Sequence, residues 1–198
     1  MVSMGQKEQL LAGARACIVE RGYANTTARD IANASGAHLA SIGYHFGSKD
    51  ALMNAAVLEI IEEWGDRLTH ADTLGAGSPA DRLERFLEGI LAAGTDERRV
   101  LVASVQSYAQ AEFVPELREQ LRQVYNTARR DIAALVLGIE RDTVSTEQAE
   151  TVGSIALSLI NGAVLQWLVD PADSRGASRI AAAVSALAPE TSPVNPRP

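Results

Sequence analysis

The side chains that most often carry out catalysis or bind metals are few and scattered in this sequence. The three histidines, His38, His45 and His70, do not share one helical face with acids or a cysteine at ligand spacing, as a metal site would require. The single cysteine, Cys17, has no partner for an internal disulfide, and it lies on an apolar stripe that predicts a small buried side chain. We therefore predict no metal, no cofactor and no redox chemistry.

One glycine motif has the spacing of a nucleotide-binding loop. Gly75-x-Gly77-x-x-Ala80 resembles a dinucleotide fingerprint, but such a loop follows a strand, and no strand pattern precedes this one. The sequence also lacks the G-x-S-x-G, H-E-x-x-H and phosphate-loop motifs of hydrolases, metalloproteases and nucleotide-binding enzymes. We interpret the motif as a flexible loop between helices and predict that the protein is not an enzyme.

Aromatic and amide side chains beyond residue 60 are the groups best suited to bind a small molecule. Mixtures of this kind line ligand cavities, although each residue can also be plain core. No carboxylate or arginine stands out within an apolar face, which favours an apolar or weakly polar ligand over an anionic one. The candidate ligand-binding residues are Trp64, Phe86, Gln106, Tyr108, Phe113, Tyr125, Asn161, Gln166 and Trp167.

The acidic charge of the chain lies in its larger C-terminal part. The 198 residues have a formal net charge of −7, but residues 1–50 hold five basic and four acidic side chains, which leaves 13 basic and 21 acidic for the rest. An acidic body repels DNA, whereas a near-neutral end lets a few directed cations decide which end approaches it. Polar residues interrupt the longest apolar stretch, 155–169, so we expect a globular, cytoplasmic protein without a membrane segment.

Apolar residues recur at helical spacing almost throughout and strand alternation is absent, so the predicted fold is all-α. Capping motifs at Thr27-x-x-Asp30, Ser78-Pro79-x-Asp81 and Ser145-x-x-Gln148 each predict the start of a helix. We expect helices over about 6–21, 28–34 and 38–46, a long one after Ser48, and others from 79, around 101–108, over 117–139, over 146–169 and over 175–188.

Residues 31–45 fit the helix-turn-helix template, in which two short helices cross at a tight turn. Ala32 is small where the second helix crosses closely, Gly36 supplies a positive φ in the turn, and Ile31 and Ile42 point into the core. An ordinary corner between two helices would show some of the same features.

The longer stretch 22–52, GYANTTARDIANASGAHLASIGYHFGSKDAL, resembles the DNA-binding domain of the TetR family of transcriptional regulators. The resemblance is clear over about residues 6–55. It implies an N-terminal three-helix DNA-binding domain over residues 1–47 and a helical regulatory and dimerisation domain over 48–188. The Pro-rich tail, 189–198, is expected to be disordered.

The resemblance also implies which residues contact double-stranded operator DNA. The 38–46 helix would enter the major groove, where Ser41, Leu39 and Ala40 can contact bases, with Arg29 and His38 beside them. Thr27, Tyr44, His45 and Lys49 match positions that mostly hold the phosphate backbone in the family. The family usually has a tyrosine where this chain has Gly43, so we expect altered docking on the operator.

The 146–169 helix is apolar on two faces, which a single contact within one chain cannot bury. We expect a symmetric homodimer formed by this helix and the last one, with Gly153 and Gly162 allowing close approach; a central helix wrapped by its own chain is the alternative. The predicted function is a repressor that a small-molecule inducer releases from operator DNA. A constitutive DNA-binding regulator and a helical adaptor that binds only proteins remain the alternatives.

Overall fold

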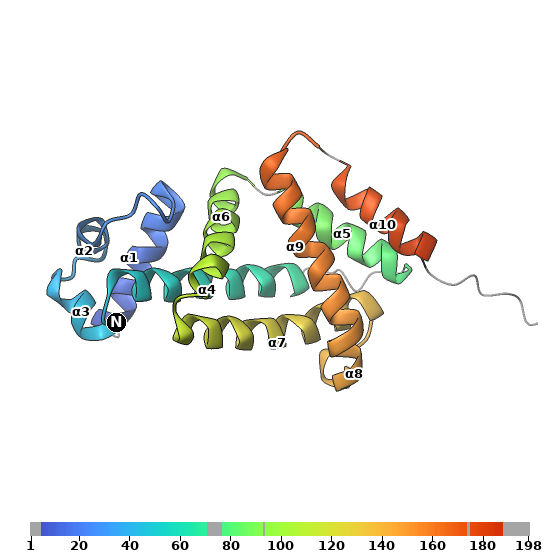
Figure 1. Cartoon of the computed structure of the whole chain (residues 1–198), viewed down its shortest axis with the longest axis horizontal. Coiled ribbons are helices and arrows are strands. Elements are labelled where there is room, and N and C mark those ends of the chain that lie inside the picture. The colour runs from blue at the N-terminus through green and yellow to red at the C-terminus, as the bar shows by residue number, and fades with distance from the viewer. Residues whose placement is uncertain (1–4, 71–76, 93, 174, 188–198) are drawn as a thin grey trace, which may run out of the picture.

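The computed structural model describes residues 5–70, 77–92, 94–173 and 175–187, and every regular element within these ranges is helical (Figure 1). The predicted all-α fold is therefore confirmed. The expected loop at 72–77 lies outside the described residues except for Gly77, and so does the expected tail at 189–198.

The first three helices form a compact N-terminal unit. They are α1 (Gln6–Arg21), α2 (Ala28–Ser35) and α3 (Ala40–Phe46), drawn in blue at the left of Figure 1. Gly13 lets α1 and α2 pack closely, because a Cβ at this position would lie 2.8 Å from Cβ of Ser35. The third helix begins two residues later than expected from the sequence, with Leu39 already in helical conformation before it.

Helix α4 (Lys49–His70) joins this unit to the rest of the chain. The remaining elements are α5 (Pro79–Leu91), α6 (Thr95–Gln110), α7 (Pro115–Leu137), a short 3₁₀ turn η1 (Arg141–Thr143), α8 (Thr146–Gln148), a π-helical segment η2 (Ala149–Gly153), α9 (Ser154–Val169) and α10 (Gly176–Leu187). In Figure 1, α4 and α7 run side by side along the molecule and α6 stands across them, between the N-terminal unit and α9.

Two large apolar cores correspond to the two ends of the molecule. The N-terminal core combines residues of α1, α2, α3 and α4, including the fully buried Leu10, Ile31 and Leu52. The C-terminal core combines α5, α6, α7, α9 and α10, with Leu87 and Ile90 at its centre. Helix α6 contributes to both cores, through Val100 and Ala103 to the first and Leu101 to the second.

The expected continuous helix over 146–169 is divided by the π-helical segment. Gly153 lies at this point against α7, and a Cβ there would come within 2.1 Å of the carbonyl oxygen of Arg129. The small size of Gly153 therefore serves a crossing within the chain and not the dimer contact predicted from the sequence. Gly162 does face open space, as that prediction requires.

One side of α9 remains open in the single chain. Ala156, Ile160, Ala163 and Val164 are buried against the C-terminal core, whereas Ile155 and Val169 are 66% and 87% exposed. The segment Thr146–Val169 is also long and apolar enough to cross a membrane by length and composition alone. The apolar residues of this segment therefore form two sets, one packed against the core of the protein and one exposed on the outside.

Candidate DNA-binding surface and effector cavity

The turn between α2 and α3 has the geometry that the helix-turn-helix template requires. Gly36 ends α2 in the left-handed region, with φ of 67°. Ile31 is fully buried and Ile42 is 4% exposed, so both point into the N-terminal core as predicted. The turn therefore fixes α3 across α2 and leaves the outer side of α3 free of the core.

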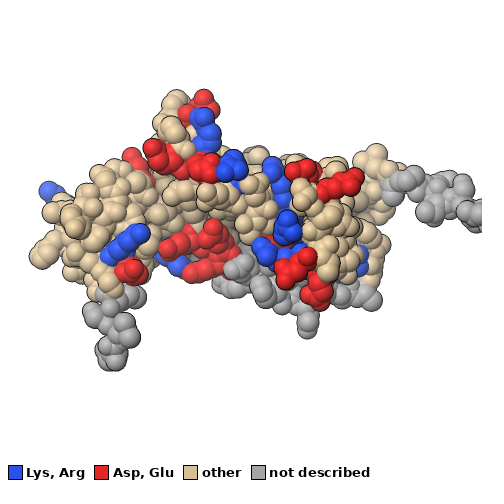
Figure 2. All heavy atoms as spheres, turned by 90° about the horizontal axis from the view of Figure 1, so that it is seen from below, with Lys and Arg blue, Asp and Glu red and all other residues tan. Residues whose placement is uncertain are grey.

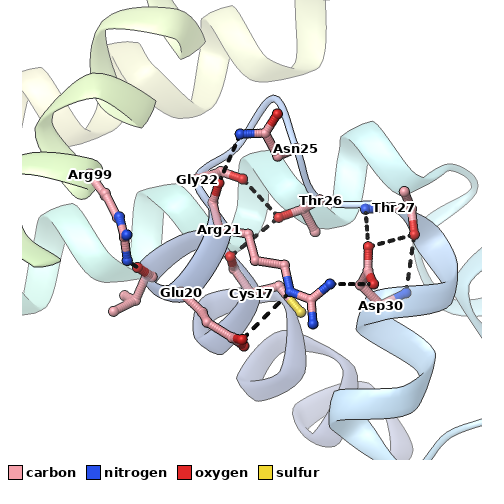
Figure 3. A network of polar contacts seen from close by, with 10 residues as sticks. Cys17, Glu20, Arg21, Gly22, Asn25, Thr26, Thr27, Asp30 and Arg99 are labelled. Carbon is pink, nitrogen blue, oxygen red and sulfur yellow. Dashed lines mark hydrogen bonds and ion pairs between the residues drawn. The ribbon is translucent and has the colours of Figure 1, made fainter.

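A polar network holds the start of α2 against the end of α1 (Figure 3). Asp30 Oδ2 accepts hydrogen bonds from the backbone nitrogen of Thr27 at 2.9 Å and from its hydroxyl at 2.6 Å, and the Asp30 backbone nitrogen donates to the Thr27 hydroxyl at 3.2 Å. Arg21 Nη1 donates to Asp30 Oδ1 at 2.8 Å. The hydrogen bonds from Thr27, followed by the charge of Arg21, lower the pKa of Asp30, so it is ionised at neutral pH.

The predicted DNA-contacting residues gather around the outer side of α3. His38, Leu39, Ala40 and Tyr44 are exposed, and Ser41 is half-buried beside them. Arg29 is exposed on the neighbouring α2. The exposed fractions of Leu39 and Tyr44 are 48% and 86%, although the Tyr44 ring meets the His45 ring edge to face, so a large part of both side chains is available to a partner.

His45 and Lys49 are held more firmly. The His45 ring nitrogen Nε2 lies 3.3 Å from Oε1 of Gln6 at the start of α1. Lys49 Nζ donates to the carbonyl oxygen of Thr26 at 3.3 Å and lies 3.2 Å from Oδ1 of Asp50. These contacts place both side chains at the edges of the surface, beside the starts of α1, α2 and α4.

Gly43 leaves a gap on this surface. A Cβ at this position would meet no atom within 4 Å, so the backbone could carry a side chain here without a clash. Packing around the backbone therefore does not require a glycine at this position.

Figure 2 shows the charge on one face of the molecule. Seen from below, acidic side chains group along the middle, whereas the left-hand end, which carries α1 to α3, is mostly uncharged with a few basic and acidic side chains.

A cavity of about 420 Å³ lies between α4, α5, α6, α7 and α9. Its lining is mostly apolar, with three aromatic rings from Phe86, Tyr108 and Tyr125 and a small number of polar groups. Volume and lining match those of small-molecule sites in proteins.

The two tyrosines and Asn161 form a connected group in this cavity. The rings of Tyr108 and Tyr125 meet edge to face, with centroids 5.9 Å apart, and Nδ2 of Asn161 donates to the Tyr125 hydroxyl at 3.0 Å. Burial and a hydrogen bond with Tyr125 raise the pKa of Tyr108, so its hydroxyl stays neutral.

The structure places only some of the predicted ligand-binding residues on this cavity. Phe86, Tyr108, Tyr125 and Asn161 line it. The Trp64 side chain lies outside the described part of the chain, although its backbone belongs to α4.

The other candidates lie elsewhere, which corrects the expectation that they enclose the interior. Phe113 is 80% exposed in the turn between α6 and α7, and Gln166 is exposed on the open side of α9. Trp167 packs against the C-terminal core, with the guanidinium carbon of Arg98 5.1 Å from its ring centroid. Gln106 is half-buried, and its Oε1 atom has no hydrogen-bond partner. The apolar periodicity of a helix predicts that one face is buried, but it does not show which other helix packs against that face.

Two carboxylates that the sequence analysis did not select also line the cavity, Glu62 on α4 and Asp131 on α7. Asp131 lies three residues after the lining residue Ala128 and seven after Val124, so it flanks the apolar stripe at helical spacing. Arg141 binds its Oδ1 atom. The spacing of Asp131 was therefore a signal available in the sequence.

Comparison with known proteins identifies the family of both parts of the chain. Residues 10–56 match the model described as "Bacterial regulatory proteins, tetR family", and residues 79–191 match "BetI-type transcriptional repressor, C-terminal". The chain is 23% identical over 173 residues to the nicotine-responsive transcriptional repressor HdnoR of Paenarthrobacter nicotinovorans, covering 87% of this chain and 89% of that protein. It is 27% identical over 177 residues to the transcriptional regulator BetI of Brucella anthropi, covering 89% and 88%.

A solved structure shares the fold. It is a putative transcriptional regulator from Saccharomonospora viridis in complex with choline, with a TM-score of 0.62 and 23% sequence identity, over 91% of this chain and 93% of that one. The matches confirm the predicted class of function, a DNA-binding transcriptional repressor controlled by a small molecule, and not the helical adaptor. With the helix-turn-helix at one end, the cavity at the other, and most of the chain matched by the two family models, this chain belongs to the TetR family of bacterial transcriptional regulators.

Proposed function

We propose that this repressor binds operator DNA through α3 and releases it when a small organic cation enters the cavity. The observation that carries the effector class is the lining itself. Among the described lining residues there are two carboxylates, Glu62 and Asp131, and no lysine, arginine or histidine. A cation gains from the negative charge of these carboxylates, of which Asp131 also binds Arg141 through Oδ1, whereas the lining offers an anion no positively charged side chain.

The aromatic lining supports the same class of effector. Cations of the ammonium type bind over tyrosine and phenylalanine rings, and quaternary ammonium ligands are often held in aromatic cages. Phe86, Tyr108 and Tyr125 supply three rings at the cavity. The relative that responds to nicotine and the related structure that holds choline point the same way, because nicotine is an amine and choline a quaternary ammonium ion.

The roles of individual residues at the DNA follow from where they lie. The exposed side of α3, with His38, Leu39, Ala40 and Ser41, would face base edges in the major groove. Thr27, Tyr44, His45 and Lys49 surround it and would hold phosphates. Arg29 reaches from α2 and can form two hydrogen bonds to a guanine or to one phosphate.

Helix α4 links the two sites. Lys49 stands at its start beside the DNA-binding surface, and Ile61 and Glu62 stand at the cavity, about 20 Å along the helix at 1.5 Å per residue. A ligand that shifts the cavity end of a rigid helix shifts its other end as well. The distance between two recognition helices in a dimer, which must fit half-sites fixed by DNA geometry, then changes.

The open side of α9 is the surface through which we propose that two copies pair. A second copy would cover the exposed Ile155 and Val169, and Gly162 would allow the two α9 helices to approach closely. Binding of DNA by a symmetric dimer requires a near-palindromic operator.

The effector class is tested with choline and its neutral isostere, in which a carbon atom replaces the charged nitrogen. We expect calorimetry on the full chain to show choline binding at least about tenfold more tightly than the isostere, since about 1.4 kcal/mol of charge interaction suffices for that factor. Nicotine and octanoate extend the series, with octanoate expected not to bind.

Variants assign the preference to the cavity. Asp131→Asn should reduce the ratio of the affinity for choline to the affinity for its isostere. Asp142→Asn removes the same charge from an exposed position in η1 and should leave this ratio unchanged. Equal affinity for choline and the isostere, or tighter binding of octanoate, would contradict a cationic effector.

A further inference from the structure

Two adjacent arginines near the start of α6 bind the ends of two different helices. Arg99 Nη1 donates to the carbonyl oxygen of Val19 at 2.5 Å, in the last turn of α1. Arg98 Nη2 donates to the carbonyl oxygen of Leu168 at 3.0 Å, in the last turn of α9. Figure 3 shows Arg99 reaching from α6 to the end of α1, on the side away from Thr27 and Asp30. The pair therefore joins α6 to the DNA-binding unit on one side and to α9 on the other.

The contact of Arg99 completes the end of α1. The last carbonyl groups of a helix have no partner within it and carry partial negative charge, which a guanidinium satisfies. The neighbouring carbonyl oxygens accept hydrogen bonds from residues close by in the chain. The Thr26 hydroxyl donates to the carbonyl oxygen of Cys17 at 3.3 Å, and the Gly22 nitrogen donates to that of Ile18 at 2.9 Å. At Val19 the donor comes instead from a helix of the regulatory domain.

The cavity bears directly on the same helix. Leu101, Ser104 and Val105 of α6 line the cavity, within two turns of the arginines. Val100 and Ala103 of α6 pack into the N-terminal core. A displacement of α6 by a bound ligand must therefore either carry the end of α1 with it or break the bond between Arg99 and Val19.

From this geometry we infer that Arg99 is a positioning residue that sets the orientation of the DNA-binding unit on the regulatory domain. It passes the displacement of α6 to α1, and through α1 to the recognition helix. The part of this inference that concerns the effector rests on the proposed function. The part that concerns DNA does not, because loss of the cap leaves the DNA-binding unit in several orientations and so weakens binding to two half-sites at fixed spacing.

The test compares Arg99→Met with two other variants. Arg118→Met is the matched control: Arg118 Nε donates to Ala111 at 3.1 Å and its Nη2 to Glu112 at 2.8 Å, so it closes the end of α6 entirely within the regulatory domain. Arg99→Lys keeps a cation that can still meet one carbonyl group. Methionine keeps an apolar stem in both arginine positions, which limits the change in packing.

Operator affinity is measured by fluorescence anisotropy on a duplex selected with the wild-type chain, and thermal stability is measured in parallel. We expect Arg99→Met to bind the duplex about tenfold more weakly, within the usual range of coupling between sites. Arg118→Met should bind like the wild type and Arg99→Lys should recover most of the loss. Saturating choline should weaken operator binding less in Arg99→Met than in the wild type. The affinity of the free variant for choline should equal that of the wild type.

An operator affinity of Arg99→Met equal to that of the wild type would overturn the inference. An equal loss in Arg118→Met would also overturn it, because the effect would then follow from general stability. A wild-type chain that binds the duplex but not choline or nicotine would contradict the proposed effector class alone, and the three operator affinities would still decide the role of Arg99.

Discussion

At the scale of single residues, the proposed DNA-binding surface contains two kinds of cation. Arg29 is exposed on α2, with a long side chain that can adapt to a base edge or a phosphate. Lys49 is half-buried, and its ammonium group already donates to the carbonyl of Thr26. A charge fixed at the edge of the surface is suited to a phosphate at fixed distance, whereas the forked guanidinium is suited to guanine.

We therefore expect Lys49→Ala to weaken binding to all DNA sequences and to flatten the dependence of affinity on salt, because fewer counterions are released from the duplex. Arg29→Ala should instead relax sequence preference, at a cost of about 1–3 kcal/mol on the preferred sequence if it reaches a base. Anisotropy titrations at several salt concentrations, on the selected duplex and on a scrambled one, measure both effects. Equal losses on the two duplexes for Arg29→Ala would show that Arg29 contacts only phosphate.

At the scale of elements, the same capping box starts both α2 and α5. Thr27 and Asp30 begin α2, and Ser78 and Asp81 begin α5, with the carboxylate accepting from the cap nitrogen and the hydroxyl accepting from the nitrogen three residues on. The hydrogen bonds at each cap lower the pKa of Asp30 and of Asp81 below the ordinary value of 3.8. Each helix start is therefore coupled to the ionisation of one carboxylate.

The sign of the pH dependence follows from these lowered pKa values. The ionised carboxylates stabilise the folded chain above the ordinary pKa, and this contribution is lost as the pH falls through the lower, folded value. We expect Asp30→Asn and Asp81→Asn each to lower the free energy of unfolding at pH 6, and the difference from the wild type to shrink at pH 3. Urea unfolding at the two pH values measures it, and a difference that does not shrink at pH 3 would contradict the role of the charge.

At the scale of the whole molecule, α1 to α3 with the proposed DNA-binding surface lie at one end and α9 lies in the other half of the chain (Figure 1), where its Ile155 and Val169 are exposed. The membrane-length segment Thr146–Val169 has one side in the C-terminal core and one side exposed. A second copy can cover that exposed side and at the same time supply the second recognition helix that a two-fold operator needs.

Charged substitutions on this face test the pairing. We expect Ile155→Glu and Val169→Glu to shift the chain from dimer to monomer in sedimentation experiments at micromolar concentration, because each would bury an unpaired charge at the contact. Phe113→Glu is the control, since Phe113 is 80% exposed but lies in the turn between α6 and α7. A wild-type monomer, or an equal shift with Phe113→Glu, would contradict an interface on α9.

The helices and the helix-turn-helix follow from local patterns in the sequence. The capping boxes at Thr27, Ser78 and Ser145 and the left-handed turn at Gly36 all occur in the structure as predicted. These features depend on hydrogen bonds between residues three positions apart and on the backbone freedom of one glycine, so the information for them is local.

Which faces of those helices meet could not be predicted from local patterns. The folded structure places Asp131 and Glu62 at the cavity, Phe113 and Gln166 at the surface, and Gly153 in contact with α7. It also brought Arg99 to the end of α1, 80 positions away in the chain. The periodicity of one helix shows that it has an apolar face, but the residues that share a site depend on how helices cross, and that is set by packing between distant segments.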